Sequence, residues 1–299
     1  MTSIPFLTFA DGVVEAFAPA KVNLYLQVVG RRADGYHLLD SLVAFAGVGD
    51  RLTFRQDDDL SLSLDGPNAR ALAVEADNIV LKAARALAAA AGVPAKAAIT
   101  LTKRLPVASG IGGGSADGVA ALRGLCRLWG LALDEVELAR IGLSLGADLP
   151  VCLAGRPTQM SGIGEILAPA PALPPAWLVL VNPGVGLSTP AVFKARKAAF
   201  SGASPLVEAP VDAAALASVL ADRRNDLTEP AVSLAPVIGD MLKAIGDQKD
   251  CLLARMSGSG ATCFGLFADK EAADAAADSL TAAHATWWVA AAPLVSRPE

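Results

Sequence analysis

A glycine-rich stretch at residues 105–117 is the part of the sequence whose residue types most directly indicate chemistry. Four glycines, Gly110 and Gly112 to Gly114, fall within five positions, and an apolar repeat of helical period follows at once. Glycine lets backbone approach a ligand closely, and a helix that begins there turns unpaired N–H groups and the positive end of its dipole toward the loop. The stretch therefore predicts an anion site, most commonly for phosphate. A flexible turn without a ligand is the alternative.

Two common phosphate motifs do not fit this loop. The Walker loop requires a lysine directly after its last glycine, and neither Gly113 nor Gly114 is followed by lysine. The dinucleotide fingerprint requires glycine at a sixth position, where counting from Gly110 places Ser115, and it also requires a later acidic residue that does not stand out here. The loop is therefore predicted to hold phosphate in another way.

Asp148 and Lys21 have the side chains needed for proton transfer and charge stabilisation. Asp148 follows a predicted helix and has apolar neighbours, so partial desolvation would suit it to accept a proton. Lys21 lies, with Asn23, at or near the predicted start of a strand. An ammonium beside a carboxylate and a phosphate could stabilise charge in a transition state. A turn aspartate before Pro150 and a solvated surface lysine are the alternatives, and both stay open at this point.

Three further residues could contact a ligand. Tyr36 and His37 follow a polar glycine turn, and together they could stack on a flat ring and hydrogen-bond it. The alternative is a structural histidine beside a packing tyrosine. Thr189 precedes Pro190, which first predicts a helix N-cap and only secondarily a ligand contact. The acidic run 57–59 is predicted to be a solvated hairpin tip and not a metal site.

The elements that must position these residues follow from the apolar periodicity. In the first half we predict strands at 6–18, 22–29, 41–45, 50–55, 60–64 and 97–102, and helices at 78–91, after the glycine loop, and from 134 to about 145. In the second half we predict strands at 177–181, 251–256, 262–267 and 286–292, and helices at 190–200, 212–221, 236–247 and 270–284. The glycines thus lie in the strand–loop–helix order that a phosphate loop needs.

A loop rich in Gly, Pro and Ser at 155–164 indicates where the chain divides. We predict two domains, 1–158 and 159–299. The first would carry the glycine loop, Lys21 and Asp148. A second glycine-rich turn, residues 257–262, would join two strands of the second domain.

The composition of the 299 residues argues against several classes of protein. The net charge is −5 without a basic patch, which argues against a nucleic-acid partner. The apolar runs are too short to span a bilayer, and the N-terminus lacks the basic region of a secretory signal. The four cysteines are scattered without a Cys-x-x-Cys pair, so we predict reduced thiols and assign no metal ligand. We therefore expect a cytoplasmic protein that binds neither nucleic acid nor membrane.

Several segments, taken in order, resemble the GHMP kinase superfamily along nearly the whole chain. Residues 106–116, Pro-x3-Gly-Ile-Gly-Gly-Gly-Ser-Ala, are similar to the ATP-phosphate loop of that superfamily, which lacks a Walker lysine. The segment 33–37, Ala-Asp-Gly-Tyr-His, narrows the resemblance to the branch whose substrate carries a cytidyl group. Further similar segments are 18–26, 103–106, 145–150, 182–190, 225–227 and 256–262.

The resemblance implies a two-domain α+β kinase with its active site in the cleft between the domains. Lys21 and Asp148 match the catalytic pair, with Asp148 as the base for a substrate hydroxyl. On the substrate side the resemblance implies Asn23 and Thr189, with Tyr36 and His37 at the cytosine ring. On the nucleotide side it implies Asn78 and Lys103 at the adenine, and at the phosphates Pro106, Val107, Ala108, Ser109, Gly110, Ile111, Gly112, Gly113, Gly114, Ser115 and Ala116.

The implied reaction is ATP-dependent phosphorylation of an alcohol on a cytidyl-bearing small molecule. Mg²⁺ is expected with ATP, without a protein ligand assigned to it, and the chain is expected to be a monomer or a weak homodimer. Two alternatives remain. A kinase of mevalonate or homoserine would leave Tyr36 and His37 without a nucleobase to hold. A non-catalytic nucleotide-binding regulator would tolerate loss of Lys21 and Asp148.

Overall fold

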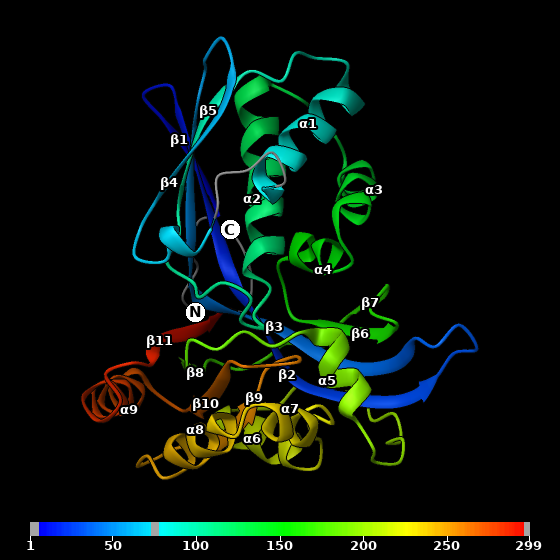
Figure 1. The fold of residues 1–299 in the computed structure, drawn as a ribbon, viewed down its shortest axis with the longest axis vertical. Coiled ribbons are helices and arrows are strands. Elements are labelled where there is room, and N and C mark those ends of the chain that lie inside the picture. Colours follow the sequence, from blue (N-terminus) through cyan, green and yellow to red (C-terminus); the bar gives the residue numbers. More distant parts are fainter. Residues whose placement is uncertain (1–5, 73–77, 296–299) are drawn as a thin grey trace.

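The computed structural model describes residues 6–72 and 78–295, which form two lobes (Figure 1). Both lobes combine helices with β-strands, so the α+β class predicted from the sequence is confirmed. Within the described part of the chain, no helix is both long and apolar enough to cross a membrane.

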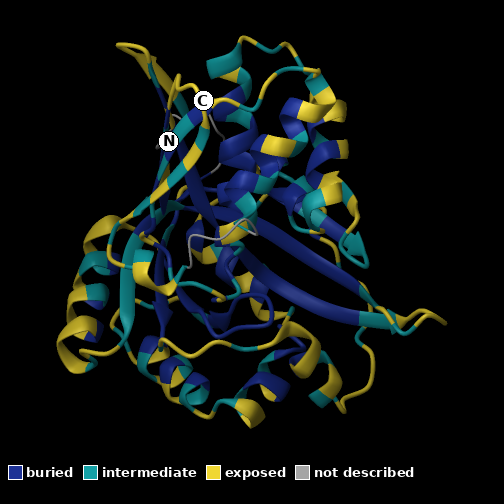
Figure 2. Ribbon diagram, turned by 45° about the horizontal axis from the view of Figure 1, so that its top comes forward, coloured by how far each residue is buried: buried dark blue, intermediate teal, exposed yellow. Residues whose placement is uncertain are grey.

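Two strands of 19 residues, β2 (Val13–Arg31) and β3 (His37–Arg55), form an antiparallel hairpin that runs through both lobes (Figure 1). Most of their residues are buried, and the tip of the hairpin is exposed (Figure 2). The predicted division of each strand into two is wrong. The register shifts between Pro19 and Ala20, where proline has no N–H to donate, and the strand bulges there without ending.

This continuity changes the position of two predicted site residues. Lys21 and Asn23 lie in the middle of β2 and not at a strand start. The predicted strand 6–18 is instead a hairpin, in which β1 (Leu7–Ala10) turns into β2 at Asp11-Gly12. Both turn residues have positive φ, as the common two-residue hairpin turn requires.

The remaining strands of the upper lobe are arranged around β3. One edge of β3 pairs with β2, and the other pairs in turn with β6 (Thr158–Gly162), β11 (Trp288–Val295) and β5 (Ala97–Thr102). β4 (Leu60–Asp65) pairs with β5, and β7 (Ile166–Pro169) pairs with β6. The acidic run 57–59 is exposed as predicted, but it connects β3 to β4 across β5 and is not a hairpin tip.

Four helices form a layer on one face of this upper sheet (Figure 1): α1 (Ile79–Ala91), α2 (Gly113–Trp129), α3 (Glu135–Leu145) and α4 (Leu149–Ala154). A single short turn, η1 (Ala69–Ala71), precedes them in the chain. α2 lies directly on β2 and β3. Asn78 caps α1, and Asp134 forms the predicted capping box with Glu137 at the start of α3. α4 was not predicted. Pro150 resembles a turn signal, although proline is well accepted in a first helical turn.

The lower lobe is a four-stranded sheet between two layers of helices. Its order is β11, β8 (Trp177–Asn182), β10 (Cys263–Phe267) and β9 (Leu253–Met256). Alternate residues of β8 face opposite sides. Val179 and Val181 join the core with residues of α8 (Val237–Gly246) and α9 (Lys270–Ala283), whereas Leu178 and Leu180 join the core with residues of α6 (Ala213–Ala221).

In this lobe the predicted strands 177–181, 251–256, 262–267 and 286–292 and the predicted helices 212–221, 236–247 and 270–284 are confirmed, with ends that differ by at most three residues. The predicted helix 190–200 is α5 (Thr189–Ala195), which ends earlier. α7 (Thr228–Leu234) was missed, and in the sheet around β3 the predicted loop 155–164 contains β6. The seven residues of α7 form about two turns, too few for the apolar repeat of a helix to be recognised.

Candidate active site

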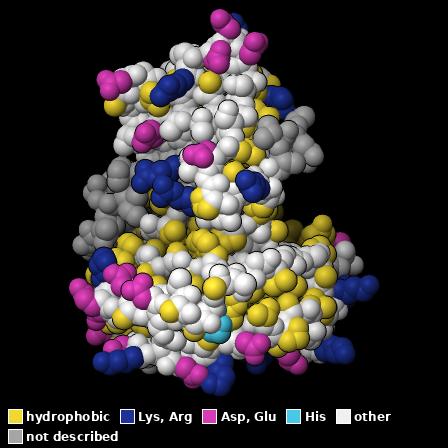
Figure 3. Space-filling view, turned by 60° about the vertical axis from the view of Figure 1, so that its left-hand side comes forward, with side chains coloured by type: hydrophobic (Ala, Val, Ile, Leu, Met, Phe, Trp, Pro, Cys, Tyr) yellow, Lys and Arg dark blue, Asp and Glu magenta, His cyan; other side chains and the backbone are white. Residues whose placement is uncertain are grey.

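A cleft with a volume of about 770 Å³ opens between the two lobes. Figure 3 shows the molecule narrowing between the lobes, with hydrophobic side chains exposed at this waist. The lining combines residues of β2, the glycine loop, the first turn of α2, and the second glycine turn. The volume falls within the range of about 300–1,000 Å³ typical of small-molecule sites.

The glycine loop, residues 106–116, is docked on the edge of β2. The backbone N–H of Lys21 donates to the carbonyl oxygen of Ile111 over 2.9 Å. Gly112 has a φ of +63°, and a Cβ there would lie 3.0 Å from the Cβ of Lys21, so both its conformation and its close approach require glycine. α2 begins at the next residue, and a Cβ on Gly114 would meet nothing within 4 Å. The first turn of α2 therefore presents accessible backbone to the cleft, as an anion site needs.

The second glycine turn, residues 257–262, packs against this loop. The hydroxyl of Ser257 donates to the carbonyl oxygen of Gly110 over 3.3 Å and accepts from the backbone N–H of Asn23 over 3.1 Å. Gly110 has a φ of +77°, and a Cβ on it would lie 2.3 Å from the carbonyl oxygen of Gly260. The two turns are thus in direct backbone contact and form one wall of the cleft.

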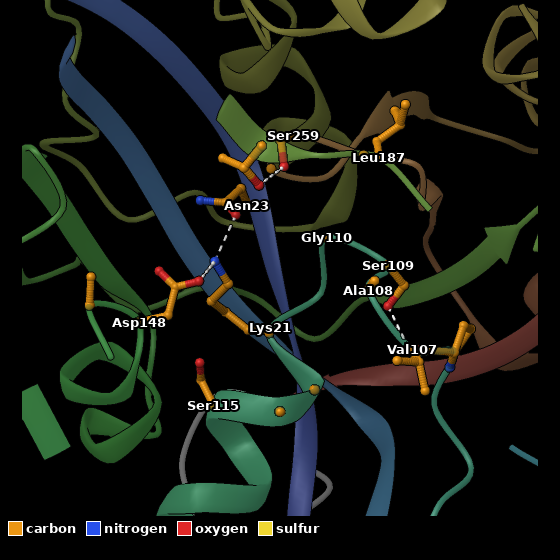
Figure 4. Close-up of a pocket in the computed structure, with 18 of the residues that line it drawn as sticks. Lys21, Asn23, Val107, Ala108, Ser109, Gly110, Ser115, Asp148, Leu187 and Ser259 are labelled. Atoms are coloured by element: carbon orange, nitrogen blue, oxygen red, sulfur yellow. Dashed lines mark hydrogen bonds and ion pairs between the residues drawn. The ribbon is translucent and has the colours of Figure 1, made fainter. Parts of the chain in front are cut away.

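Lys21, Asn23 and Asp148 meet inside the cleft (Figure 4). Nζ of Lys21 lies 3.3 Å from Oδ2 of Asp148 and donates to Oδ1 of Asn23 over 3.2 Å. The amide of Asn23 donates to Oγ of Ser41 over 2.8 Å, which fixes the orientation of Asn23. Lys21 is buried, but the Asp148 side chain is 48% exposed, so Asp148 is less desolvated than the sequence predicts. A carboxylate that is open to the cleft and paired with an ammonium can accept a proton from a bound hydroxyl.

Lys103 and Asn78 line the same cleft beside the first turn of α2. The ammonium of Lys103 lies 2.6 Å from Oδ2 of Asp50 and 2.6 Å from Oδ2 of Asp117. Burial acts to lower the pKa of Lys103, but the two carboxylates outweigh burial and raise it, so Lys103 stays charged. Oδ1 of Asn78 accepts from the backbone N–H of Val80 and caps α1.

Thr189 and Ser259 form the part of the cleft that belongs to the lower lobe. Their hydroxyl oxygens lie 2.8 Å apart, and both residues line the cleft. Thr189 is the first residue of α5 and Ser188 is the N-cap, so the predicted capping role of Thr189 is wrong by one position. The hydroxyl of Thr189 hydrogen-bonds Ser259 and does not cap the helix.

Tyr36 and His37 lie at the tip of the β2–β3 hairpin and do not belong to the described residues that line the cleft. Tyr36 is exposed, whereas His37 stacks on Phe193 of α5 with ring centroids 4.9 Å apart and planes at 21°. Phe193 does line the cleft, so this pair connects the hairpin tip to it. Burial lowers the pKa of His37, and the positive charges of Arg31 and Arg196 lower it further. The imidazole is therefore neutral near pH 7.

Most residues of the predicted site are brought together in this one cleft, but two side chains of the loop are not. Ile111 and Ala116 are buried in the apolar cores, so only their backbone could contact a nucleotide. The residues of the predicted set that do line the cleft are Lys21, Asn23, Asn78, Lys103, Pro106 to Gly110, Gly112 to Ser115, Asp148 and Thr189.

Sequence reasoning missed four residues that the structure places in or beside the cleft. Two of them could have been found from the local sequence. Phe193 follows Thr189 by one helical turn, and Ser259 lies within the second glycine turn. Asp50 and Asp117 carried no such signal. Their contact with Lys103, the residue after β5, joins β3 and α2 to the start of the glycine loop, and only the folded chain brings these segments together.

Two family models match the chain. The model described as GHMP kinases N terminal domain matches residues 78–156, and the model described as GHMP kinases C terminal matches residues 208–286. The two-domain GHMP kinase-like fold predicted from the sequence is confirmed by these matches and by the structural likeness below.

Similar proteins extend these matches to nearly the whole chain. A 4-diphosphocytidyl-2-C-methyl-D-erythritol kinase of Paramagnetospirillum magneticum is 63% identical over 279 residues, which cover 93% of this chain and 98% of the relative. A crystal structure of a 4-(cytidine 5'-diphospho)-2C-methyl-D-erythritol kinase is 35% identical and has a TM-score of 0.78, with 94% of this chain and 98% of that chain covered. A homoserine kinase from Cytophaga hutchinsonii covers 97% of this chain and 96% of its own, with 18% identity and a TM-score of 0.71, which is a likeness of fold alone.

Proposed function

Because the chain belongs to the family of 4-diphosphocytidyl-2-C-methyl-D-erythritol kinases within the GHMP kinases, we propose that it transfers the γ-phosphoryl group of ATP to the 2-hydroxyl of 4-diphosphocytidyl-2-C-methyl-D-erythritol. The products are the 2-phosphate and ADP. The reaction is a step in the non-mevalonate synthesis of isoprenoid precursors. The chain is an ATP-dependent kinase that acts on an alcohol.

The observation that carries this proposal is the contact between Lys21 and Asp148 in the cleft that the open first turn of α2 also lines. Phosphoryl transfer needs mainly in-line positioning and stabilisation of charge. Holding the two reactants in line supplies about 7–11 kcal/mol, whereas one helix-terminus contact supplies about 0.3–2 kcal/mol. The loop therefore acts chiefly by aligning ATP, while Asp148 takes the proton of the attacking hydroxyl and Lys21 stabilises the charge that develops.

The acceptor would occupy the part of the cleft between β2 and the lower lobe. Asn23 is fixed by Ser41 and can hydrogen-bond the alcohol beside Lys21. The hydroxyls of Thr189 and Ser259 can hydrogen-bond the acceptor from the opposite side. Tyr36, His37 and Phe193 supply three rings around the hairpin tip, where a flat cytosine could stack and accept or donate hydrogen bonds.

Mg²⁺ would enter with ATP. No group of three or more His, Cys, Asp or Glu side chains able to hold a metal ion gathers in residues 6–72 and 78–295. Mg²⁺ does not need such a group, because it usually keeps several waters and is held by nucleotide phosphates together with one or two protein oxygens. Ser115, which projects from the first turn of α2 in Figure 4, is the protein oxygen we propose for this role. The ion would neutralise charge on the transferring phosphate.

The nucleotide would lie along the glycine loop, with Lys103 and Asn78 beside its base. Residues 1–158 and 159–299 remain our proposed division into domains, and the cleft between them is the proposed active site. We also propose that the protein acts in the cytoplasm on this small molecule, as a monomer or a weak homodimer.

Measuring ADP release with three acceptors in parallel tests the proposal: the cytidyl alcohol, mevalonate and homoserine. Turnover with the cytidyl alcohol alone is expected, because only this acceptor uses Tyr36, His37 and Phe193. Turnover with mevalonate or homoserine alone would overturn the proposal. Nucleotide binding without turnover of any acceptor would favour a non-catalytic role.

A further inference from the structure

We propose that Asp117 selects the base of the phosphoryl donor, and that its free carboxylate oxygen accepts a hydrogen bond from the 6-amino group of adenine. This inference rests on the proposed function, since it assumes that the cleft takes a nucleoside triphosphate. Sequence reasoning did not include Asp117 in the nucleotide site.

The position of Asp117 follows from the geometry of α2. The phosphates would lie at the first turn of this helix, which begins at Gly113. At a rise of about 1.5 Å per residue, Asp117 lies about 6 Å further along the axis. The cleft extends there past Leu72, Ile79 and Leu101, whose apolar side chains suit the face of a flat ring. Asp117 is among the residues that line this cleft.

The two carboxylates that hold Lys103 differ in how well they are satisfied. Asp50 accepts three hydrogen bonds: Oδ2 accepts from Lys103, and Oδ1 accepts from the backbone N–H groups of Arg104 and Leu105 over 2.6 and 2.8 Å. Among the residues that the structure describes, Asp117 accepts one, at Oδ2, from Lys103. Asp117 is 2% exposed, and its Oδ1 has no hydrogen-bond partner among the described residues.

A buried carboxylate oxygen without a partner is costly, so Oδ1 must either keep a proton or receive a donor. Burial raises the pKa of Asp117, and although Lys103 lowers it, the nearby charge of Asp50 adds to the rise, so the charged form is costly while Oδ1 lacks a donor. A donor from the ligand can take the place of that proton, which then leaves to solvent. The 6-amino group of adenine is such a donor.

The same oxygen would reject a 6-oxo purine. Adenine presents an amino donor at its 6-position, whereas guanine and hypoxanthine present an acceptor there. Two acceptors facing each other in a buried site leave both unsatisfied. Lys103 adds to this selection: its ammonium carries three N–H groups, of which two donate to Asp50 and Asp117, and we assign the third to a ring nitrogen beside the amino group. Together, Asp117 and Lys103 match the adjacent donor and acceptor of adenine.

The test is equilibrium binding of three nucleotides to the protein with Mg²⁺ and without the alcohol acceptor. The nucleotides are ATP, purine riboside triphosphate, which lacks the amino group, and inosine triphosphate, which carries a 6-oxo group. For the unchanged protein we expect binding of ATP to be about 10- to 100-fold tighter than binding of either analogue, the effect of one hydrogen bond to a charged group. Equal affinity for all three would overturn the proposal without any variant being made.

Two variants distinguish base selection from a structural role. Asp117→Asn can donate to a 6-oxo group, so we expect the preference for ATP over inosine triphosphate to fall by about tenfold or more. Asp50→Asn is the matched control, because it weakens the contact with the same lysine but does not line the cleft. It should weaken binding of all three nucleotides by one common factor. If Asp117→Asn also weakened binding of all three nucleotides by the same factor, Asp117 would have only a structural role. Because no acceptor is present, this result is independent of whether the cytidyl alcohol is turned over.

Discussion

Thr262 donates both its backbone N–H and its hydroxyl to a single acceptor, the carbonyl oxygen of Ser109, over 3.1 and 2.7 Å. The hydroxyl of Thr262 also accepts from the side-chain amide of Asn182 at the end of β8, over 2.9 Å. All three residues are buried. The lower lobe thereby holds the glycine loop of the upper lobe through one threonine, so the shape of the proposed phosphate site depends on both lobes.

The first prediction concerns the contact between the two glycine turns. Gly110→Ala would place a Cβ 2.3 Å from the carbonyl oxygen of Gly260, at a residue whose φ is +77°. Overpacking and the unfavourable backbone conformation should together lower the free energy of unfolding by about 1–3 kcal/mol. ATP binding should weaken as well, because the loop must move. Urea denaturation and nucleotide titration measure the two effects.

Gly114→Ala is the matched control. A Cβ there meets nothing within 4 Å, and alanine favours the helix, so the free energy of unfolding should not fall. The added methyl group would nevertheless project into the space proposed for the phosphates and weaken ATP binding. If Gly110→Ala were as stable as Gly114→Ala, the contact between the two turns would contribute nothing to folding.

Sequence reasoning located the proposed chemistry better than it located the elements that carry it. The glycine loop, Lys21 and Asp148 were found from residue types, and the structure places all three in one cleft. Lys21 was nevertheless assigned to a strand start, because Pro19 resembles an interruption. The bulge that lets a strand continue past a proline depends on the partner strand, which no local pattern contains.

The parts that could not be predicted are contacts between distant segments. Asp50 and Asp117 lie 53 and 14 residues from Lys103, and nothing in the intervening sequence indicates that the three side chains meet. The exposure of Asp148 was also misjudged. Leu149 and Val151, its apolar neighbours in α4, pack into the core, while the carboxylate turns to the cleft.

Asp148 is expected to be essential for turnover but not for folding. Asp148→Asn keeps the shape of the side chain and removes its ability to accept a proton, so kcat should fall by about 10²- to 10⁴-fold. The KM for ATP and the thermal midpoint should change little. Asp240→Asn, an exposed site on α8, is the control for loss of one negative charge. Full activity in Asp148→Asn would remove Asp148 from the mechanism.

Lys21 and Asp148 should act as one unit. Lys21→Met removes the ammonium that contacts Asp148 and Asn23, and kcat should fall by roughly 10²- to 10³-fold, as for loss of one stabilising donor. The double variant Lys21→Met/Asp148→Asn should be little worse than Asp148→Asn alone, because residues that share one step are not additive. Single-turnover rates for the four proteins measure this. Strictly multiplicative losses would show that the two residues serve different steps.

His37 should make binding of the cytidyl alcohol sensitive to acid. Burial, together with the charges of Arg31 and Arg196, lowers its pKa, so the neutral imidazole persists to a pH below the usual value of 6.5. The KM for the alcohol should stay constant from about pH 8 to 6.5 and rise below that range, as an imidazolium forms beside two other cations. Arg31→Gln removes one of these cations and should move the rise to higher pH. The two histidines of the chain give two imidazole signals by NMR, so the titration of His37 can be followed directly. A midpoint at or above 6.5 in the unchanged protein would contradict this account.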